Sequence, residues 1–151
     1  MNASKKSLLL DSSVLVKLFH QDEADVDMAL LLRSGHMDGH WEIRLADLSV
    51  YELANALHYI GKYPAKEIIE GIQSLLALEL HIYSFDARIL HTGLELCAEK
   101  KISIYDSYLV ALTKHENLVF VTADEKLARK FQSDPDVIML SQLSSELDEE
   151  E

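Results

Sequence analysis

Four acidic side chains could do chemistry together if the fold brings them to one place. Each follows an apolar segment or lies in the first turn of an expected helix; they are Asp11, Glu52, Asp106 and Asp124. Converging carboxylates repel one another, which raises some of their pKa values and costs stability. A hard divalent cation removes that cost, and a ligand set made only of oxygen favours Mg²⁺ or Mn²⁺ over Zn²⁺. Such a cluster supports phosphodiester hydrolysis, in which the metal activates a water molecule and stabilises the leaving oxygen.

Two of these acids follow apolar segments that are typical of buried strands. The run Leu8–Leu10 is too short for a helix and ends directly at Asp11. The run Asn117–Val121 is apolar and β-branched, as a central parallel strand should be, and ends three residues before Asp124. Ligands of open α/β sheets bind just outside the carboxyl ends of the strands, so both carboxylates are candidates for a site at that edge. Asp11 could instead simply cap the helix expected after it.

The other two acids lie near the starts of helices. Glu52 follows Ser49 by three residues, which is the spacing of a capping box and explains Glu52 without any site. A helix that follows a strand nevertheless places its first turn at the same sheet edge as Asp11. Asp106 follows Ser103 at the same spacing. It joins the other carboxylates only if its helix packs at this edge, which the spacing alone does not decide.

Three polar residues are predicted to support the carboxylates rather than to bind the metal themselves. The hydroxyls of Ser12 and Thr122 could donate hydrogen bonds that orient the neighbouring acids. Asn55 lies away from the apolar stripe of the helix that carries Glu52, although ordinary solvent exposure would also explain its position.

Strand-like and helix-like segments alternate along the chain. Strands are expected over 7–10, 43–48, 81–85, 117–121 and 137–140, and helices over 12–19, 22–35, 49–60, 65–78, 87–100, 103–112 and directly after Asp124. This alternation predicts an α/β fold with a mostly parallel, twisted sheet of four to five strands and helices on both faces.

Length and composition indicate one domain. The chain has 151 residues, of which 48% are hydrophobic, and its 5 Gly and 2 Pro form no linker. We expect a domain over 1–145 and a disordered acidic tail over 146–151. The net charge of −12 is the opposite of the basic footprint of a nucleic-acid binder. It does not exclude an RNA substrate, but it removes any long-range electrostatic argument for one.

Other features exclude further classes of protein. The single cysteine, Cys97, cannot form an intrachain disulfide, and no segment resembles a signal peptide or a membrane span, so a cytoplasmic protein is expected. His36 and His40 lie between Gly35 and Trp41, in a segment expected to be a loop because glycines bracket it. No third nitrogen or sulfur ligand stands at a recognisable spacing, which argues against a zinc site there.

The segments around the four acids resemble the four acidic motifs of PIN-domain ribonucleases. They run from Leu10 to Leu18, from Ser49 to Leu57, from Ile104 to Leu112 and from Val121 to Ala128. They come in the order of that family and span about 8 to 131.

The resemblance is closest to the toxins of VapBC-type toxin-antitoxin pairs. It implies a Mg²⁺- or Mn²⁺-dependent endoribonuclease in which Asp11, Glu52, Asp106 and Asp124 hold the metal. It also implies a homodimer and a cognate antitoxin that commonly inserts an arginine among the carboxylates, and an acidic pocket suits a guanidinium. The segment 36–41 and the acidic tail depart from the compact toxin pattern.

Two other functions are compatible with an α/β fold that carries these acids. A catalytically inactive protein of the same fold could grip a basic partner with its acidic pocket, which the charge of −12 favours. A phosphatase with Asp11 as nucleophile is disfavoured, because the dehalogenase-like pattern requires a second Asp two residues later, where this chain has Ser13.

Overall fold

Short apolar strands alternate with helices along the part of the chain that the computed structural model describes, residues 5–143. The strands are β1 (Lys6–Leu10), β2 (Trp41–Ala46), β3 (His81–Tyr83), β4 (Val119–Thr122) and β5 (Val137–Met139). The helices are α1 (Ser12–Phe19), α2 (Val26–Met37), α3 (Asp47–Ile60), α4 (Ala65–Leu76), α5 (Ala87–Lys100), α6 (Ile104–His115) and α7 (Glu125–Lys130), and a 3₁₀ turn (Leu140–Gln142) follows β5.

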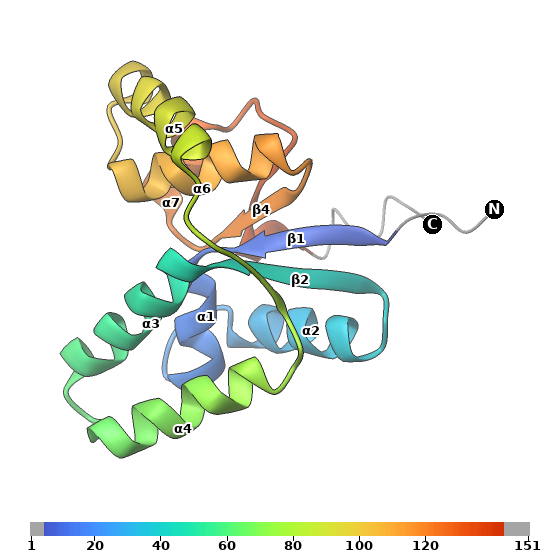
Figure 1. Cartoon of the computed structure of the whole chain (residues 1–151). Helices are drawn as coiled ribbons and strands as arrows, with labels where there is room; N and C mark the ends of the chain where they lie inside the picture. The colour runs from blue at the N-terminus through green and yellow to red at the C-terminus, as the bar shows by residue number, and fades with distance from the viewer. Residues whose placement is uncertain (1–4, 144–151) are drawn as a thin grey trace.

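The five strands form one parallel sheet in the order β3-β2-β1-β4-β5 (Figure 1). Leu9 of the central strand is in register with Arg44 of β2 and with Phe120 of β4. From β1 the chain builds the sheet outward through β2 and β3 on one side and through β4 and β5 on the other. The carboxyl ends of β1 and β4 therefore flank the point where the strand order reverses, which is where open α/β sheets bind ligands. The predicted α/β class is confirmed.

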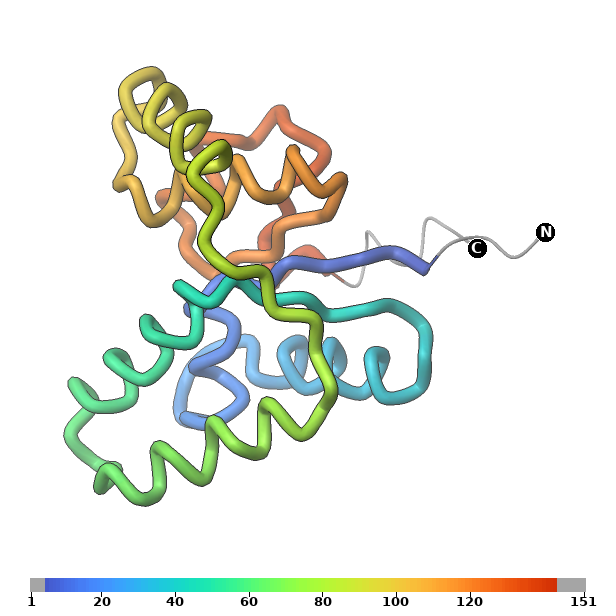
Figure 2. Tube along the Cα trace, viewed as in Figure 1, coloured from blue at the N-terminus to red at the C-terminus, as the bar shows by residue number. Residues whose placement is uncertain are grey.

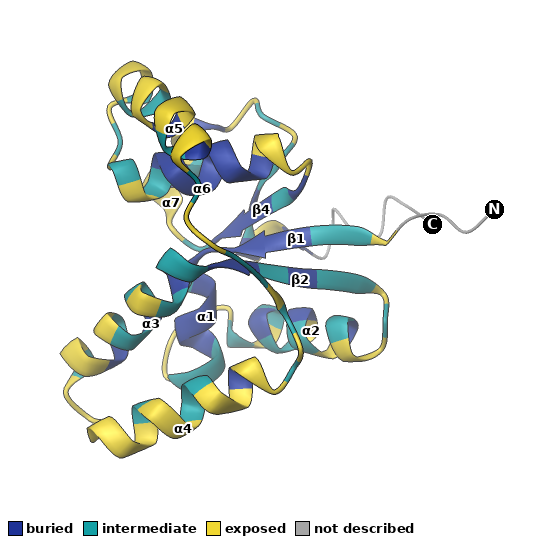
Figure 3. Ribbon diagram, viewed as in Figure 1, coloured by how far each residue is buried: buried dark blue, intermediate teal, exposed yellow. Residues whose placement is uncertain are grey.

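Helices cover both faces of the sheet, because the side chains of each strand alternate between them. Leu8 and Leu10 pack in a core cluster with residues of α1 to α4, whereas Leu9 and Phe120 pack with residues of α5 to α7. The trace in Figure 2 passes from one layer to the other through β3. Figure 3 shows that α6 is buried over much of its length, while α4 and α5 are largely exposed.

The second helix extends further than its glycine suggests. Gly35 was expected to end it, but α2 continues to Met37, so part of the segment expected to be a loop is helical. The cause is a close contact: the indole of Trp41 lies where a Cβ on residue 35 would be, and its Nε1 donates to the carbonyl of Leu32 at 2.8 Å. Glycine lowers helix propensity, but here only glycine leaves room for the ring.

The expected capping box at Ser49 is wrong. Helix α3 begins at Asp47, after Ala46 in the N-cap position, so Ser49 lies inside the helix and its hydroxyl is buried without a partner. Glu52 is therefore not a capping residue.

The other expected elements are present with small shifts of their ends. Ser103 caps α6 as its spacing suggests, by accepting a hydrogen bond from the backbone N–H of Asp106. Asp86 caps α5 in the same way, by accepting a bond from the backbone N–H of Arg88. The acidic tail 146–151 lies outside the described residues. No helix within residues 5–143 is long and apolar enough to cross a membrane.

Candidate active site

Asp11 lies at the carboxyl end of β1 and is only 5% exposed. Its Oδ2 accepts hydrogen bonds of 2.8 Å from the hydroxyls of both Ser13 and Thr122. The Ser13 hydroxyl in turn accepts a 3.0 Å bond from the backbone N–H of Ala123. These bonds tie the end of β1 to the end of β4, and they fix the orientation of the carboxylate.

The alternative reading of Asp11 as a helix cap does not hold. Its side chain makes no capping hydrogen bond to α1, although the residue occupies the N-cap position. Burial raises the pKa of Asp11, the hydroxyls of Ser13 and Thr122 partly offset that rise, and the charge of Asp124 adds to it. A buried carboxylate that neither caps a helix nor pairs with a cation calls for another explanation.

Asp124 follows β4 and caps α7. Its Oδ1 accepts bonds of 3.0 and 3.2 Å from the backbone N–H groups of Lys126 and Leu127. Its own backbone N–H donates to the Thr122 hydroxyl at 3.1 Å, and that hydroxyl donates to Asp11. Capping and proximity to Asp11 therefore coexist at this residue, because the cap uses one carboxylate oxygen.

Glu52 approaches the site from α3. Its Oε1 is buried without a hydrogen-bond partner. Burial raises the pKa of Glu52 to about 7, and the charges of Asp11 and Asp106 contribute to the rise. A buried polar oxygen without a partner is costly, which is the situation that a bound cation would relieve.

Asp106 reaches the same sheet edge from α6. The spacing from Ser103 left open whether this helix packs at that edge, and in the structure it does. Burial raises its pKa most, followed by the charge of Asp11, and Asp124 adds a smaller contribution. Helix α6 is held in place by α5: a Cβ at Gly93 would lie 3.2 Å from the Cα of Tyr108, so the two helices touch backbone to backbone. This packing carries the start of α6 to the carboxyl ends of the strands.

The charges of the four acids interact, but their carboxylate oxygens are not close enough together to bind a metal ion without a change of conformation. The charges of Asp11, Asp106 and Asp124 each raise the pKa of at least one other acid of the four. Within residues 5–143, however, no three His, Cys, Asp or Glu side chains are close enough to hold a metal ion as they stand. Repulsion among unbalanced carboxylates favours conformations that separate their oxygens, and a cation would reverse that preference. The oxygen-only donor set and the unpartnered oxygen of Glu52 fit a hard divalent cation.

The supporting residues differ in part from those expected. Thr122 donates to Asp11, but the serine hydroxyl on Asp11 comes from Ser13 and not from Ser12. Asn55 is exposed and makes no side-chain hydrogen bond within the described part of the chain. The sequence offers two adjacent serines after Asp11, and the contact that distinguishes them is the bond from the distant Ala123 N–H to the Ser13 hydroxyl.

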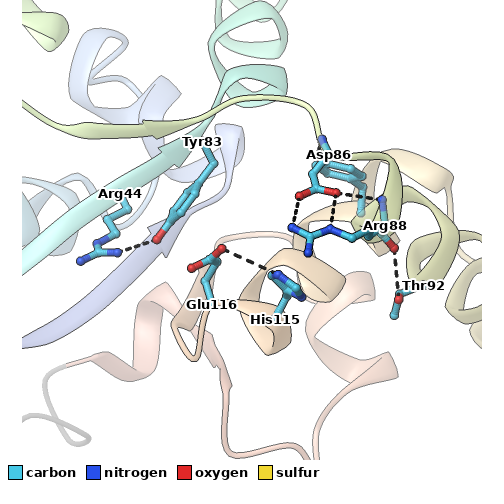
Figure 4. Close-up of polar contacts among 8 residues, drawn as sticks. Arg44, Tyr83, Asp86, Arg88, Thr92, His115 and Glu116 are labelled. Carbon is cyan, nitrogen blue, oxygen red and sulfur yellow. Dashed lines mark hydrogen bonds and ion pairs between the residues drawn. The ribbon is translucent and has the colours of Figure 1, made fainter.

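Several acids elsewhere in the molecule have cationic partners. Asp86 pairs with Arg88, whose Nη2 lies 2.8 Å from Asp86 Oδ2, and Figure 4 shows this pair together with a separate hydrogen bond between Arg44 and Tyr83. No ion pair between residues 5 and 143 includes Asp11, Glu52, Asp106 or Asp124. The cluster therefore carries uncompensated negative charge.

His36 in α2 contacts the backbone of two other segments through its ring nitrogens. His36 accepts a bond from the backbone N–H of Ile43 through Nδ1, at 3.1 Å, and its Nε2 lies 3.1 Å from the carbonyl oxygen of Leu78. Both ring nitrogens are thus occupied, which agrees with the argument against a zinc site in this segment.

Comparison with protein families matches residues 8–131 to the PIN domain. The chain belongs to the PIN domain family. The matched range contains all four carboxylates. PIN domains are generally metal-dependent nucleases.

Solved structures confirm the PIN fold. PAE2754 from Pyrobaculum aerophilum is 20% identical, with a TM-score of 0.68 over 95% of this chain and 98% of that one. VapBC2 from Rickettsia felis, bound to a DNA fragment from its promoter, is 17% identical, with a TM-score of 0.65 over 88% and 96%. VapC20 from Mycobacterium tuberculosis, a toxin that cleaves the sarcin-ricin loop, is 13% identical, with a TM-score of 0.65 over 81% and 93%. No curated protein matches significantly by sequence. At these identities the similarity establishes the fold alone.

Proposed function

We propose that this PIN domain is a Mg²⁺- or Mn²⁺-dependent endoribonuclease whose metal is held by Asp11, Glu52, Asp106 and Asp124. The observation that carries the proposal is the uncompensated charge at one sheet edge, where the buried Oε1 of Glu52 has no hydrogen-bond partner among residues 5–143. Four elements of the fold supply these acids, so their meeting is a property of the tertiary structure. A structural role would have been served better by cationic partners, which the fold provides elsewhere.

The protein's own residues have distinct parts in this proposal. The metal supplies the activation of water and the stabilisation of the leaving oxygen when it is bound. Asp11 is held rigidly by Ser13 and Thr122, so its orientation does not depend on the ligand. Asp124 is fixed by its capping bonds. Glu52 and Asp106 complete the acidic cluster from the two helix layers.

We further propose that the protein is the toxin of a toxin-antitoxin pair, that it acts in the cytoplasm and that it forms a homodimer. Support comes from its structural neighbours, which include a toxin-antitoxin complex from Klebsiella pneumoniae that is 18% identical with a TM-score of 0.63. An acidic pocket without internal cations is suited to receive an arginine from an antitoxin. The competing function is a catalytically inactive PIN-fold protein that binds a basic partner through the same pocket.

Metal binding and RNA cleavage, measured together, test the nuclease function. Calorimetry with Mg²⁺ or Mn²⁺ and cleavage of a total RNA pool would compare the wild type with Asp106→Asn and with Asp38→Asn. Asp38 is exposed and lies outside the site, so it serves as a matched control. We expect the wild type and Asp38→Asn to bind metal and to cut RNA, and Asp106→Asn to do neither. A wild type that binds no metal would instead support the inactive binding protein.

A further inference from the structure

An apolar cavity of about 290 Å³ is lined by residues of α3 and α6, the two helices that carry Glu52 and Asp106. It lies between the first turns of α3 and α6 and the segment that joins β3 to α5. Its walls are mainly aromatic and aliphatic side chains, among them Leu48, Tyr51, Phe85, Leu90, Tyr105 and Tyr108. Asp47 is the only charged residue that lines it.

The aromatic walls of this cavity are held in place but exposed. The rings of Phe85 and Tyr108 stack with an interplanar angle of 8° and a centroid separation of 6.5 Å. The backbone N–H of Phe85 donates to Asp47 Oδ2 at 3.2 Å, and that of the next residue donates to the Tyr108 hydroxyl at 3.0 Å. Phe85 is nevertheless 63% exposed, Tyr51 is 75% exposed and Tyr105 is 57% exposed. Large aromatic surfaces held open to solvent are typical of binding sites.

The cavity and the acidic site share the same two helix turns. Tyr51 directly precedes Glu52 in α3, and Tyr105 directly precedes Asp106 in α6. An RNA whose phosphodiester bond lies at the carboxylates would therefore have a neighbouring nucleotide within reach of these tyrosines.

We propose that this cavity binds an unpaired nucleobase of the RNA substrate, next to the bond that is cut. The proposal rests on the nuclease function proposed above. A nucleobase is planar and uncharged, so it can stack on the aromatic walls and tolerate Asp47 and the nearby acids, whereas a phosphate would be repelled. A protein of net charge −12 also gains little from attraction to the RNA backbone, so stacking must supply much of its affinity.

The test uses single-stranded RNA of mixed sequence that carries abasic sites at random positions. Sequencing of the products shows which positions, counted from each cut, require a base. We expect the wild type to avoid cuts with an abasic site at one position close to the cut. Tyr105→Ala should lose this avoidance and cut intact RNA about 10-fold less efficiently in kcat/KM. Tyr105→Phe should retain both properties, because it keeps the ring.

Tyr59→Ala is the matched control, since Tyr59 is an equally exposed tyrosine of the same helix as Tyr51 but does not line the cavity. It should behave as the wild type does, and Tyr51→Ala should follow Tyr105→Ala. If the wild type cleaves RNA but abasic sites have no effect on where it cuts, the base-binding site is wrong and the nuclease function stands. A wild type that cuts no unmodified RNA would overturn the nuclease function and the base-binding site with it. If Tyr105→Ala changes the molar mass measured by light scattering but not the abasic pattern, a second copy of the chain covers the cavity and the proposal fails.

Discussion

Asp11 and Asp86 occupy the same position in the local sequence pattern, but their pKa values are shifted in opposite directions. Each occupies the N-cap position of a helix that comes after a strand. Asp86 accepts the capping bond of its helix and pairs with Arg88, and the side-chain and backbone hydrogen bonds from that arginine lower the pKa of Asp86 to about 2. Asp11 accepts no capping bond, and burial raises its pKa. The pattern of strand, aspartate and helix therefore predicts a position and not a role.

The difference between acids with and without a cationic partner extends to two groups of acids in the molecule. Lys114 lies 2.6 Å from Asp134 and 2.8 Å from Asp136, so each of these two carboxylates has a cationic partner within the fold. Glu52 and Asp106 have no such partner in the described part of the chain, and burial raises the pKa of both. Acids with a cationic partner gain a favourable interaction, whereas repulsion among carboxylates without one costs stability, and under the proposed function a bound cation would remove that cost. The difference between the two groups can be tested by changing one member of each.

The largest effect is expected for Asp11→Asn. The variant keeps the size of the side chain but loses the charge that would bind the metal, so RNA cleavage should fall by at least about 100-fold. The free energy of unfolding of the metal-free protein, measured with urea, should stay equal or rise because repulsion is relieved. Asp86→Asn is the control, and it should leave cleavage unchanged. A large loss of stability in Asp11→Asn would instead indicate that Asp11 has a structural role, as Asp86 has.

Thr122→Val removes a hydrogen-bond donor to Asp11 but leaves the charge of the carboxylate unchanged. Loss of the 2.8 Å bond to Asp11 frees the carboxylate to turn, which should lower cleavage and metal affinity roughly 10-fold. The matched control is Thr92→Val on α5, whose hydroxyl makes only a 3.4 Å bond to a carbonyl of its own helix. Equal effects of the two changes on metal affinity, measured by calorimetry, would show that the orientation of Asp11 is unimportant.

Glu52→Gln should reveal the cost of the unbalanced charge through pH. The pKa of Glu52 in the folded protein is about 7, above the ordinary value of 4.5, so its contribution to stability is fully present below pH 4.5 and is lost as pH rises through about 7. With chelator present, the variant should therefore exceed the wild type in stability at pH 8 by about 1 kcal/mol, since partial solvent exposure weakens the effect. Near pH 4.5 the two should be nearly equal. Urea unfolding at both pH values measures the difference, and a constant gap would contradict the assignment.

Much of the fold could be predicted because it follows from periodicity. The apolar strands and their alternation with helices required only the hydrophobic pattern, and the carboxyl ends of β1 and β4 followed from the parallel order. The ends of helices were harder to predict. The α3 helix begins at Asp47 rather than Ser49, since Asp47 can accept a bond from its neighbour Leu48 while also holding Phe85. That second bond reaches across 38 residues, and no local rule contains it.

The site depended still more on contacts between distant segments. The position of Asp106 results from the packing of α6 against Gly93 of α5, which the sequence around Asp106 does not reveal. The choice of Ser13 over Ser12 depends on the backbone of Ala123, more than 100 residues later. Residue types could nominate the four acids, but only the packing decides which of them share one electrostatic environment.

The smallest effect is expected from Lys114→Met, which unbalances the other group of acids. Two partly exposed ion pairs are lost, so the free energy of unfolding should fall by about 0.5–1 kcal/mol, and less at high salt. Cleavage and metal affinity should not change, because Asp134 and Asp136 then gain repulsion without gaining the burial that Asp11 has. If the variant bound a divalent cation at this position as tightly as the native site does, uncompensated charge alone would be enough to make a metal centre. If it does not, burial and the fixed orientation of Asp11 are what distinguish the two groups.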